Sequence, residues 1–213
     1  MEIELTEKEM NKRIKFCKQM LRKNGEKIYN TFFSDEMGIN LSEAHINKAW
    51  APAGTRMEIE KPRKNVHLNC WGAISYFGAT SLHIFKEPLK AGVYEGIIKS
   101  HLEEMDQIYP EGYYFQHDNS SVHKAAEKEA TKMGLEILDF PTYSPDLSPI
   151  ENLWSTLKSA VAADSPKTEA QLIRSLRRNW EKVTTENALK PYFEELEDRY
   201  LDCIECNGAL LHC

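Results

Sequence analysis

The chain contains the run Tyr143-Ser144-Pro145-Asp146-Leu147-Ser148-Pro149-Ile150-Glu151-Asn152-Leu153-Trp154, in which a loop with two prolines leads into an apolar helical pattern. Proline is well tolerated in the first turn of a helix, so the pattern predicts a helix from Ile150 to Val161. Glu151 then lies in the first turn, where its carboxylate is rigidly held. Ser148 to Glu151 also match a capping box, in which Glu151 folds back onto the Ser148 amide. The two interpretations of Glu151 can partly coexist.

Two further acids end apolar runs. Asp118 ends the run from Tyr113, and Asp35 ends the run from Lys27, so each is predicted at the end of a strand. Oxygen ligands suit Mg²⁺ or Mn²⁺, and two ions roughly 3.5–4 Å apart hold both the attacking and the leaving oxygen of a phosphodiester. We therefore predict Asp35, Asp118 and Glu151 as catalytic metal ligands. The simpler alternatives are a turn residue at Asp35 and a turn or N-cap at Asp118.

These runs together resemble the catalytic core of mariner-type transposases of the DDE/D superfamily. The run from Tyr143 to Trp154 is the most specific part, and the Asp-Asn-x-x-x-His run at Asp118 and the Phe-x-Asp-Glu run at Asp35 occur in the expected order. The resemblance covers nearly the whole chain, including Trp71-Gly72-Ala73-Ile74-Ser75. Two features depart from it. Only 32 residues separate Asp118 from Glu151, slightly fewer than is usual in the family, and Ser148 replaces the usual Asn.

The resemblance implies a ribonuclease H-like α/β fold with a mixed five-stranded sheet, three antiparallel strands then two parallel ones, flanked by helices. Pattern alone predicts only a mixed α/β domain. It also implies metal-dependent cleavage of transposon ends and strand transfer into TA-containing target DNA. Asp35 would bridge two Mg²⁺ or Mn²⁺ ions, with Asp118 and Glu151 each on one side. The implied partners are DNA and a second copy of the chain, with no small-molecule substrate.

The chain is expected to divide into a helix over residues 1–26, which packs on the core as the end of a linker, and a catalytic domain over 27–213. Thr6 and Glu9 form a capping box at the start of that helix. The helix-turn-helix region that supplies most DNA affinity in the family is expected to be absent. The remaining predicted elements are a strand over 27–35, a long loop over 37–65, a hairpin of 66–76 with 81–85, helices over 94–105 and 122–133, a strand over 135–140, a helix capped by Thr168 and a last helix over 191–206.

Several polar residues near the acids are predicted to support the site: Asn119, His123, Tyr143 and Ser144. His123 either supports a ligand or reaches a phosphate, or it is a capping or core histidine. Asp146 is expected as a turn or capping residue and Trp154 as a core residue. Two groups of basic residues are predicted to contact DNA. The first is Lys61, Arg63 and Lys64. The second is Arg174, Arg177 and Arg178, which a solvated helix face also explains.

The net charge of −6 is opposite to the basic footprint of a strong DNA binder, although a carboxylate metal site contributes negative charge that its cations offset.

Five cysteines, an odd number, indicate a reducing compartment. No run is apolar enough for a membrane span or a signal peptide, so we expect a nuclear protein in a eukaryote, otherwise a cytoplasmic one, and no membrane partner. The Cys203-x-x-Cys206 pair lacks the second pair of a structural zinc site.

Two other functions fit the same residues. The first is a catalytically inactive or host-adopted transposase fragment that binds DNA or protein, which the acidic net charge favours and the three acids oppose. The second is a ribonuclease H-like nuclease or resolvase that hydrolyses DNA without strand transfer.

Overall fold

The computed structural model describes residues 4–42, 44 and 66–211. Seven α-helices, five strands and one 3₁₀ helix lie in these ranges, and none of the helices is long and apolar enough to cross a membrane. The elements are α1 (Glu7–Met20), α2 (Glu26–Tyr29), β1 (Thr31–Asn40), β2 (His67–Ile74), β3 (His83–Phe85), α3 (Ala91–Ile108), β4 (Tyr114–Gln116), α4 (Ser121–Lys132), β5 (Glu136–Ile137), η1 (Pro145–Leu147), α5 (Pro149–Asp164), α6 (Glu169–Val183) and α7 (Glu186–Glu205).

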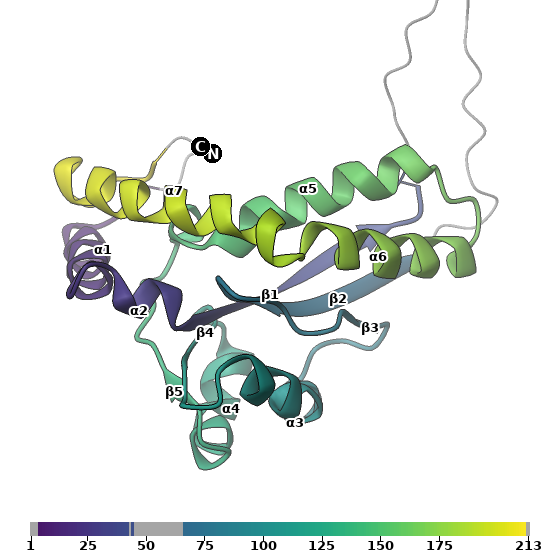
Figure 1. Cartoon of the computed structure of the whole chain (residues 1–213), viewed down its shortest axis with the longest axis horizontal. Helices are drawn as coiled ribbons and strands as arrows, with labels where there is room; N and C mark the ends of the chain where they lie inside the picture. The colour runs from purple at the N-terminus through teal and green to yellow at the C-terminus, as the bar shows by residue number, and fades with distance from the viewer. Residues whose placement is uncertain (1–3, 43, 45–65, 212–213) are drawn as a thin grey trace, which may run out of the picture.

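One mixed sheet forms the middle layer, with strand order β3-β2-β1-β4-β5. β1, β2 and β3 pair antiparallel, and β4 and β5 run parallel to β1. Helices α5, α6 and α7 cover one face, and α3 and α4 cover the other (Figure 1). The predicted five-stranded arrangement is therefore confirmed.

Alternation along β1 divides the interior into two cores. Phe33 and Met37 belong to the core beneath α5, α6 and α7, whereas Phe32 belongs to the core beneath α3 and α4. Because side chains two residues apart in a strand point to the same face, Asp35 lies on the α5 side with Phe33 and Met37. The placement of this acid is thus set by the hydrophobic pattern of its strand.

The prediction of a strand ending at Asp35 was wrong at both ends. Residues Glu26–Tyr29 form the short helix α2, which starts after Gly25 in the left-handed region at φ 73°. The strand then continues past Asp35 because Met37 and Ile39 still alternate into the core and pair with Cys70 and Leu68 of β2. The predicted loop over 37–65 was therefore wrong for 37–40, and residues 45–65 lie outside the described part. Asp35 lies in the middle of the longest strand.

Other boundaries differ less. The strand expected over 135–140 is reduced to β5, Glu136–Ile137, and α7 begins before Pro191 and contains that proline in its second turn. Thr168 accepts a hydrogen bond from the Gln171 amide, as its predicted capping role requires. The capping box of α1 is also present, with the Thr6 amide donating to the Glu9 carboxylate at 2.8 Å. Phe16, Cys17 and Met20 of α1 are buried in the same core as Tyr200 and Cys203 of α7.

Candidate metal site of three carboxylates

Asp35 lies beneath α5, and one of its oxygens has a donor from that helix. The Trp154 indole Nε1–H donates to Asp35 Oδ2 at 3.0 Å. Burial, followed by the neighbouring charges of Glu151 and Glu36, raises the pKa of Asp35 to about 8, against the opposing effect of the Trp154 hydrogen bond. A carboxyl group with such a pKa holds a proton at neutral pH unless a cation takes its place.

Asp118 follows β4 and is held from the start of α4. The Ser120 amide donates to Asp118 Oδ1 at 2.9 Å, and His123 Nδ1 lies 2.5 Å from the same oxygen. His123 Nε2 lies 3.2 Å from Glu36 Oε1. Burial alone would lower the pKa of His123, but its hydrogen bonds with Asp118 and Glu36 raise it to about 10. The His123 hydrogen bond in turn lowers the pKa of Asp118 to about 2, so this acid is ionised at neutral pH.

Glu151 occupies the first turn of α5, as predicted, but it does not act as a capping residue. No side chain caps α5, and the Ser148 hydroxyl is buried without a hydrogen-bond partner among the described residues. The capping-box interpretation of Glu151 was therefore wrong, and its carboxylate stays available. Burial raises the pKa of Glu151, the charge of Lys158 opposes that rise, and the charge of Asp118 adds to it.

The three acids line one cavity of about 360 Å³, although they come from three separate elements. Gln116 and Ser148 line the same cavity, and each has a buried oxygen without a partner among the described residues. In residues 4–42, 44 and 66–211, no three His, Cys, Asp or Glu side chains are grouped closely enough to hold a metal ion. Mg²⁺ usually keeps several waters and takes only one or two carboxylates from the protein, so it does not need a closed cage of three side chains.

The charge of the site also fits divalent cations. Within the described ranges, no lysine or arginine forms an ion pair with Asp35 or Glu151. Carboxylate oxygen donors are the ligand set that Mg²⁺ and Mn²⁺ prefer. Asp35, Asp118 and Glu151 are therefore the residues that would hold such ions.

The predicted supporting residues surround the cavity in different ways. Asn119, Tyr143 and Ser144 line it, and His123 lies behind Asp118. The Asn119 side-chain amide donates to the Phe140 carbonyl, and the Ser144 hydroxyl donates to the Thr142 carbonyl at 2.9 Å. These two hydrogen bonds hold the loop from Phe140 to Ser144. Tyr143 is 58% exposed and adopts the left-handed conformation at φ 53°, which is uncommon for a residue with a side chain.

The loop before Glu151 is fixed by a buried ion pair that the sequence did not reveal. Arg13 of α1 donates through Nη1 and Nη2 to both oxygens of Asp146, at 2.8 and 2.5 Å. Arg13 also donates to the Gly208 and Ala209 carbonyls, and the Leu211 amide donates to Asp146 at 3.0 Å. We call this set of contacts the Arg13 clamp. Asp146 lies in the turn η1, as expected, but its side chain pairs with Arg13, which the sequence did not predict.

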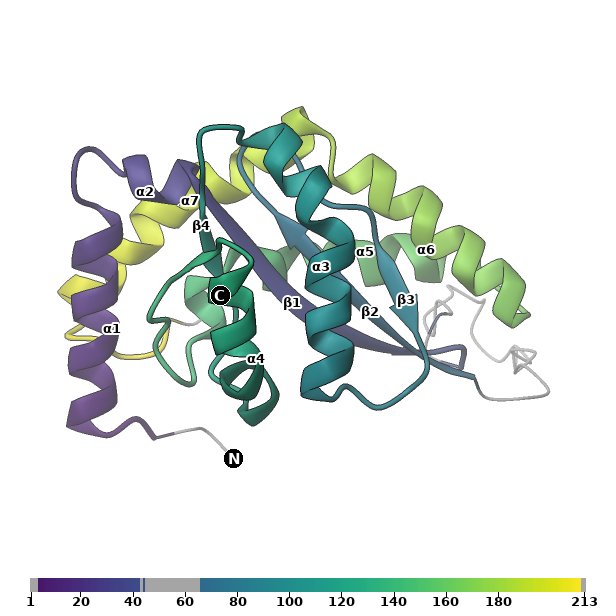
Figure 2. The same cartoon turned by 90° about the horizontal axis from the view of Figure 1, so that it is seen from below.

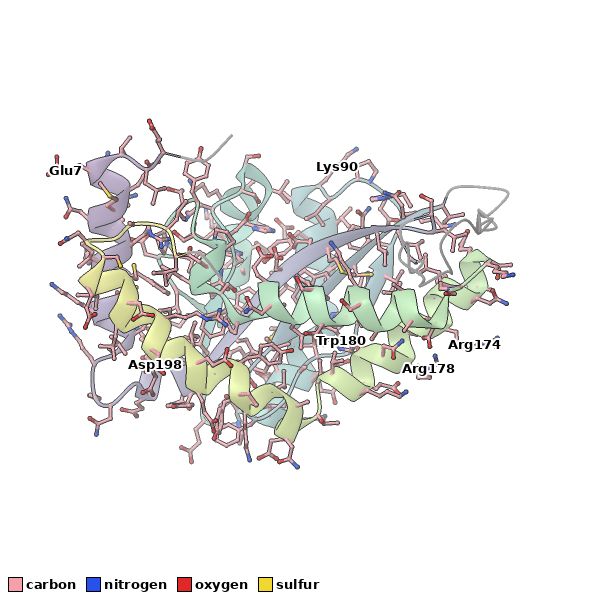
Figure 3. All side chains as sticks on the ribbon, turned by 90° about the horizontal axis from the view of Figure 1, so that it is seen from above. Glu7, Lys90, Arg174, Arg178, Trp180 and Asp198 are labelled. Atoms are coloured by element: carbon pink, nitrogen blue, oxygen red, sulfur yellow. The ribbon has the colours of Figure 1, made fainter. Side chains whose placement is uncertain are left out.

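The structure describes only one of the two basic groups that were predicted to contact DNA. Lys61, Arg63 and Lys64 lie outside the described residues. Arg174, Arg177 and Arg178 are exposed on α6, and Figure 3 labels Arg174 and Arg178 along this helix. Arg178 pairs with Asp164, whereas Arg174 and Arg177 form no ion pair with a described residue. None of the three arginines lines the cavity of the acids.

Comparisons with known proteins agree with this geometry. Residues 30–173 match the family described as DDE superfamily endonuclease, a range that includes Asp35, Asp118 and Glu151. The Tc3 transposase of Caenorhabditis elegans is 27% identical over 92% of the chain, and the match spans only 61% of that relative.

Two solved structures have the same fold. The paired-end complex of the Mos1 mariner transposase with Mn has a TM-score of 0.80 and 21% identity, over 99% of this chain and 65% of that one. The catalytic domain of Mos1 transposase has a TM-score of 0.75 and 19% identity, and the match covers each chain completely.

Proposed function

The chain belongs to the DDE superfamily endonuclease family, and on this basis we propose that it is a DNA transposase catalytic core of the Tc1/mariner type. It cuts transposon ends and joins them to target DNA with two Mg²⁺ or Mn²⁺ ions. The observation that carries the proposal is the cavity that Asp35, Asp118 and Glu151 line together, in which neither Asp35 nor Glu151 forms an ion pair with a described lysine or arginine. The chain spans about three fifths of the Tc3 transposase, so the activity of a whole transposase is itself part of the proposal.

The side chains of the site would contribute by positioning the carboxylates and by their charge. Ions held by Asp35, Asp118 and Glu151 would activate a water and stabilise a leaving 3′ oxygen. Trp154 holds one oxygen of Asp35, and His123 with the Ser120 amide holds Asp118. Glu151 is presented by the first turn of α5, and the Arg13 clamp fixes the loop before it. The site therefore needs no nucleophilic serine or cysteine.

DNA is the proposed partner, as transposon ends and as TA-containing target, with two copies of the chain acting on paired ends. The Mos1 paired-end structures support this by analogy. Arg174 and Arg177 are proposed to contact DNA phosphates because both are exposed and form no ion pair within the described ranges. A DNA substrate implies a nuclear location in a eukaryote and a cytoplasmic one otherwise.

The test combines Mn²⁺ binding with chemistry on DNA. We expect calorimetry to show saturable Mn²⁺ binding that Asp118→Asn and Glu151→Gln each abolish. Plasmid nicking should depend on the same acids, and a labelled 3′-hydroxyl end should appear in a joined product. Lys18→Gln is the matched control, because it changes an exposed charge on α1 outside the cavity and outside the proposed DNA contacts. Normal Mn²⁺ binding in both acid variants would contradict the proposed site.

The same assays separate the other functions. Nicking without a joined product indicates a hydrolytic nuclease. The net charge of −6 favours a host-adopted fragment that binds DNA or protein without catalysis. That function predicts a chain that binds no Mn²⁺, with or without DNA, and does not nick.

A further inference from the structure

Gly72 lies directly opposite Asp35 in the antiparallel pair of β1 and β2. A Cβ atom at this position would lie 2.6 Å from the Trp180 ring and 3.3 Å from the Trp154 ring. Only a residue without a side chain therefore allows these two rings to lie against the sheet beside Asp35. The sequence shows this glycine in the run from Trp71 to Ser75 but gives no reason for it.

The two tryptophans that fill this space stack on each other, with centroids 5.2 Å apart and planes at 28°. Both rings are buried, and both indole N–H groups have an acceptor, but the acceptors differ. Trp180 donates to the backbone carbonyl of Thr80 at 2.8 Å, whereas Trp154 donates to the carboxylate of Asp35 at 3.0 Å. One ring is thus tied to the backbone and the other to an acid of the site.

Trp154 and Glu151 are three residues apart on α5, so they lie about one helical turn apart on the same side of the helix. A single turn of α5 therefore delivers an acid to the cavity and a hydrogen-bond donor to a second acid from β1. Because the indole is neutral, it fixes the orientation of Asp35 without compensating its charge. An arginine in the same place would compete with a cation.

We propose that Trp154 is a positioning residue for Asp35, held in place by the stack with Trp180 over Gly72. The hydrogen bond to Oδ2 restricts rotation of the carboxylate, so the lone pairs that remain have a set direction toward a metal ion. Mutation of a residue that hydrogen-bonds a metal ligand commonly lowers metal affinity. The inference rests on the proposed function, since it assigns Asp35 as a metal ligand.

The test uses two matched variants of the 213-residue chain. Trp154→Phe keeps an aromatic ring in the stack and removes the N–H donor to Asp35. Trp180→Phe removes the equivalent N–H from the other half of the stack. We expect Trp154→Phe to weaken Mn²⁺ binding by about 10-fold in calorimetry, within the usual range for such partners. Trp180→Phe should bind Mn²⁺ as the unaltered chain does, although both variants lose a buried hydrogen bond.

A second measurement reports on the hydrogen bond itself. In the ¹⁵N-labelled chain, the indole N–H resonance that is missing from Trp154→Phe should shift during a Mg²⁺ titration. The resonance that is missing from Trp180→Phe should not shift. A purely structural tryptophan would leave both resonances unmoved.

The outcomes separate the inference from the proposed function. Equal Mn²⁺ affinity in Trp154→Phe and the unaltered chain overturns the role of Trp154 and leaves the metal site standing. Equal losses in the two variants also overturn it, because the stack and not the donor then matters. No Mn²⁺ binding in the unaltered chain, with or without DNA, overturns the proposed function and this inference with it.

Discussion

Asp146 and Asp35 are both largely enclosed by protein, but their surroundings are opposite in charge. Asp146 is matched by the Arg13 guanidinium, which bonds both of its oxygens, and by the Leu211 amide. Asp35 accepts a hydrogen bond from the neutral Trp154 indole and lies near two more acids, Glu151 and Glu36. The negative charge of Asp146 is compensated within the protein, and the charge of Asp35 is not.

The difference separates a structural acid from a candidate ligand. Asp146 lies only five positions before Glu151, so proximity in sequence gives no way to tell the two apart. The structure distinguishes the two acids by the groups that contact them, because a buried charge is stable only when it is paired or coordinates a metal. The following predictions test this contrast, starting with the largest expected effect.

Removing the partner of Asp146 should strongly destabilise the chain. Arg13→Leu leaves the carboxylate of Asp146 enclosed without its cation, and breaking a buried pair in this way typically costs about 3–5 kcal/mol. Urea denaturation with a chelator present measures the change. Lys12→Gln, an exposed neighbour on α1, is the control and should leave the midpoint unchanged. A midpoint for Arg13→Leu equal to that of the control would mean that Asp146 needs no compensation.

Metal binding should depend on pH through Asp35. Its pKa of about 8 means that a cation must displace a proton below that pH. Mg²⁺ affinity should therefore fall by about 50-fold from pH 8 to pH 6, because Asp35 is about half ionised at pH 8 and about 1% ionised at pH 6. Calorimetry in buffers of different ionisation enthalpy should detect about one released proton at pH 6. Affinity that is constant over this range would show that Asp35 is already ionised without metal.

Asp118 differs from Asp35 because its partner is a cation. His123→Gln removes the histidine whose hydrogen bond and charge lower the pKa of Asp118, and it puts a neutral hydrogen-bonding side chain in its place. We expect Mn²⁺ affinity to fall by about 10-fold, as is common when the partner of a metal ligand is changed. Calorimetry measures the effect beside His83→Gln, a histidine outside the cavity. An unchanged affinity would leave His123 with a packing role only.

The smallest effect concerns the stability of the chain without metal. Because the pKa of Asp35 is raised from 3.8 to about 8, the folded chain should lose stability as pH rises between these values. Asp35→Asn removes this penalty and should stabilise the chain by about 1 kcal/mol at pH 9 in chelator, allowing for screening at a partly exposed site. Asp118→Asn should give no such gain, because its pKa is lowered. Denaturant titrations at pH 5 and pH 9 provide the comparison, and equal behaviour of the two variants would contradict it.

The sequence predicted the order of strands and helices and the three acids, because these depend on local patterns and one distinctive run. It misplaced the ends of β1, because Met37 and Ile39 are recognisable as core residues only once β2 lies beside them. Trp154 was expected in the core, and it is buried there, but its hydrogen bond to Asp35 joins residues 119 positions apart. No local pattern predicts such a contact, and the same holds for Gly72 beneath the two indoles.

The Arg13 clamp joins parts of the chain that are very far apart in sequence. Arg13 contacts Asp146 and Gly208 across separations of 133 and 195 positions, and it ties α1 to the segment after α7, as Figure 2 lets the reader follow. Contacts across such long loops bear a large closure entropy and tend to form late in folding. The clamp should therefore be absent from the folding transition state, and its loss should speed unfolding far more than it slows folding. The segment that orients Glu151 would then owe its lifetime in the native state to a residue in the first helix.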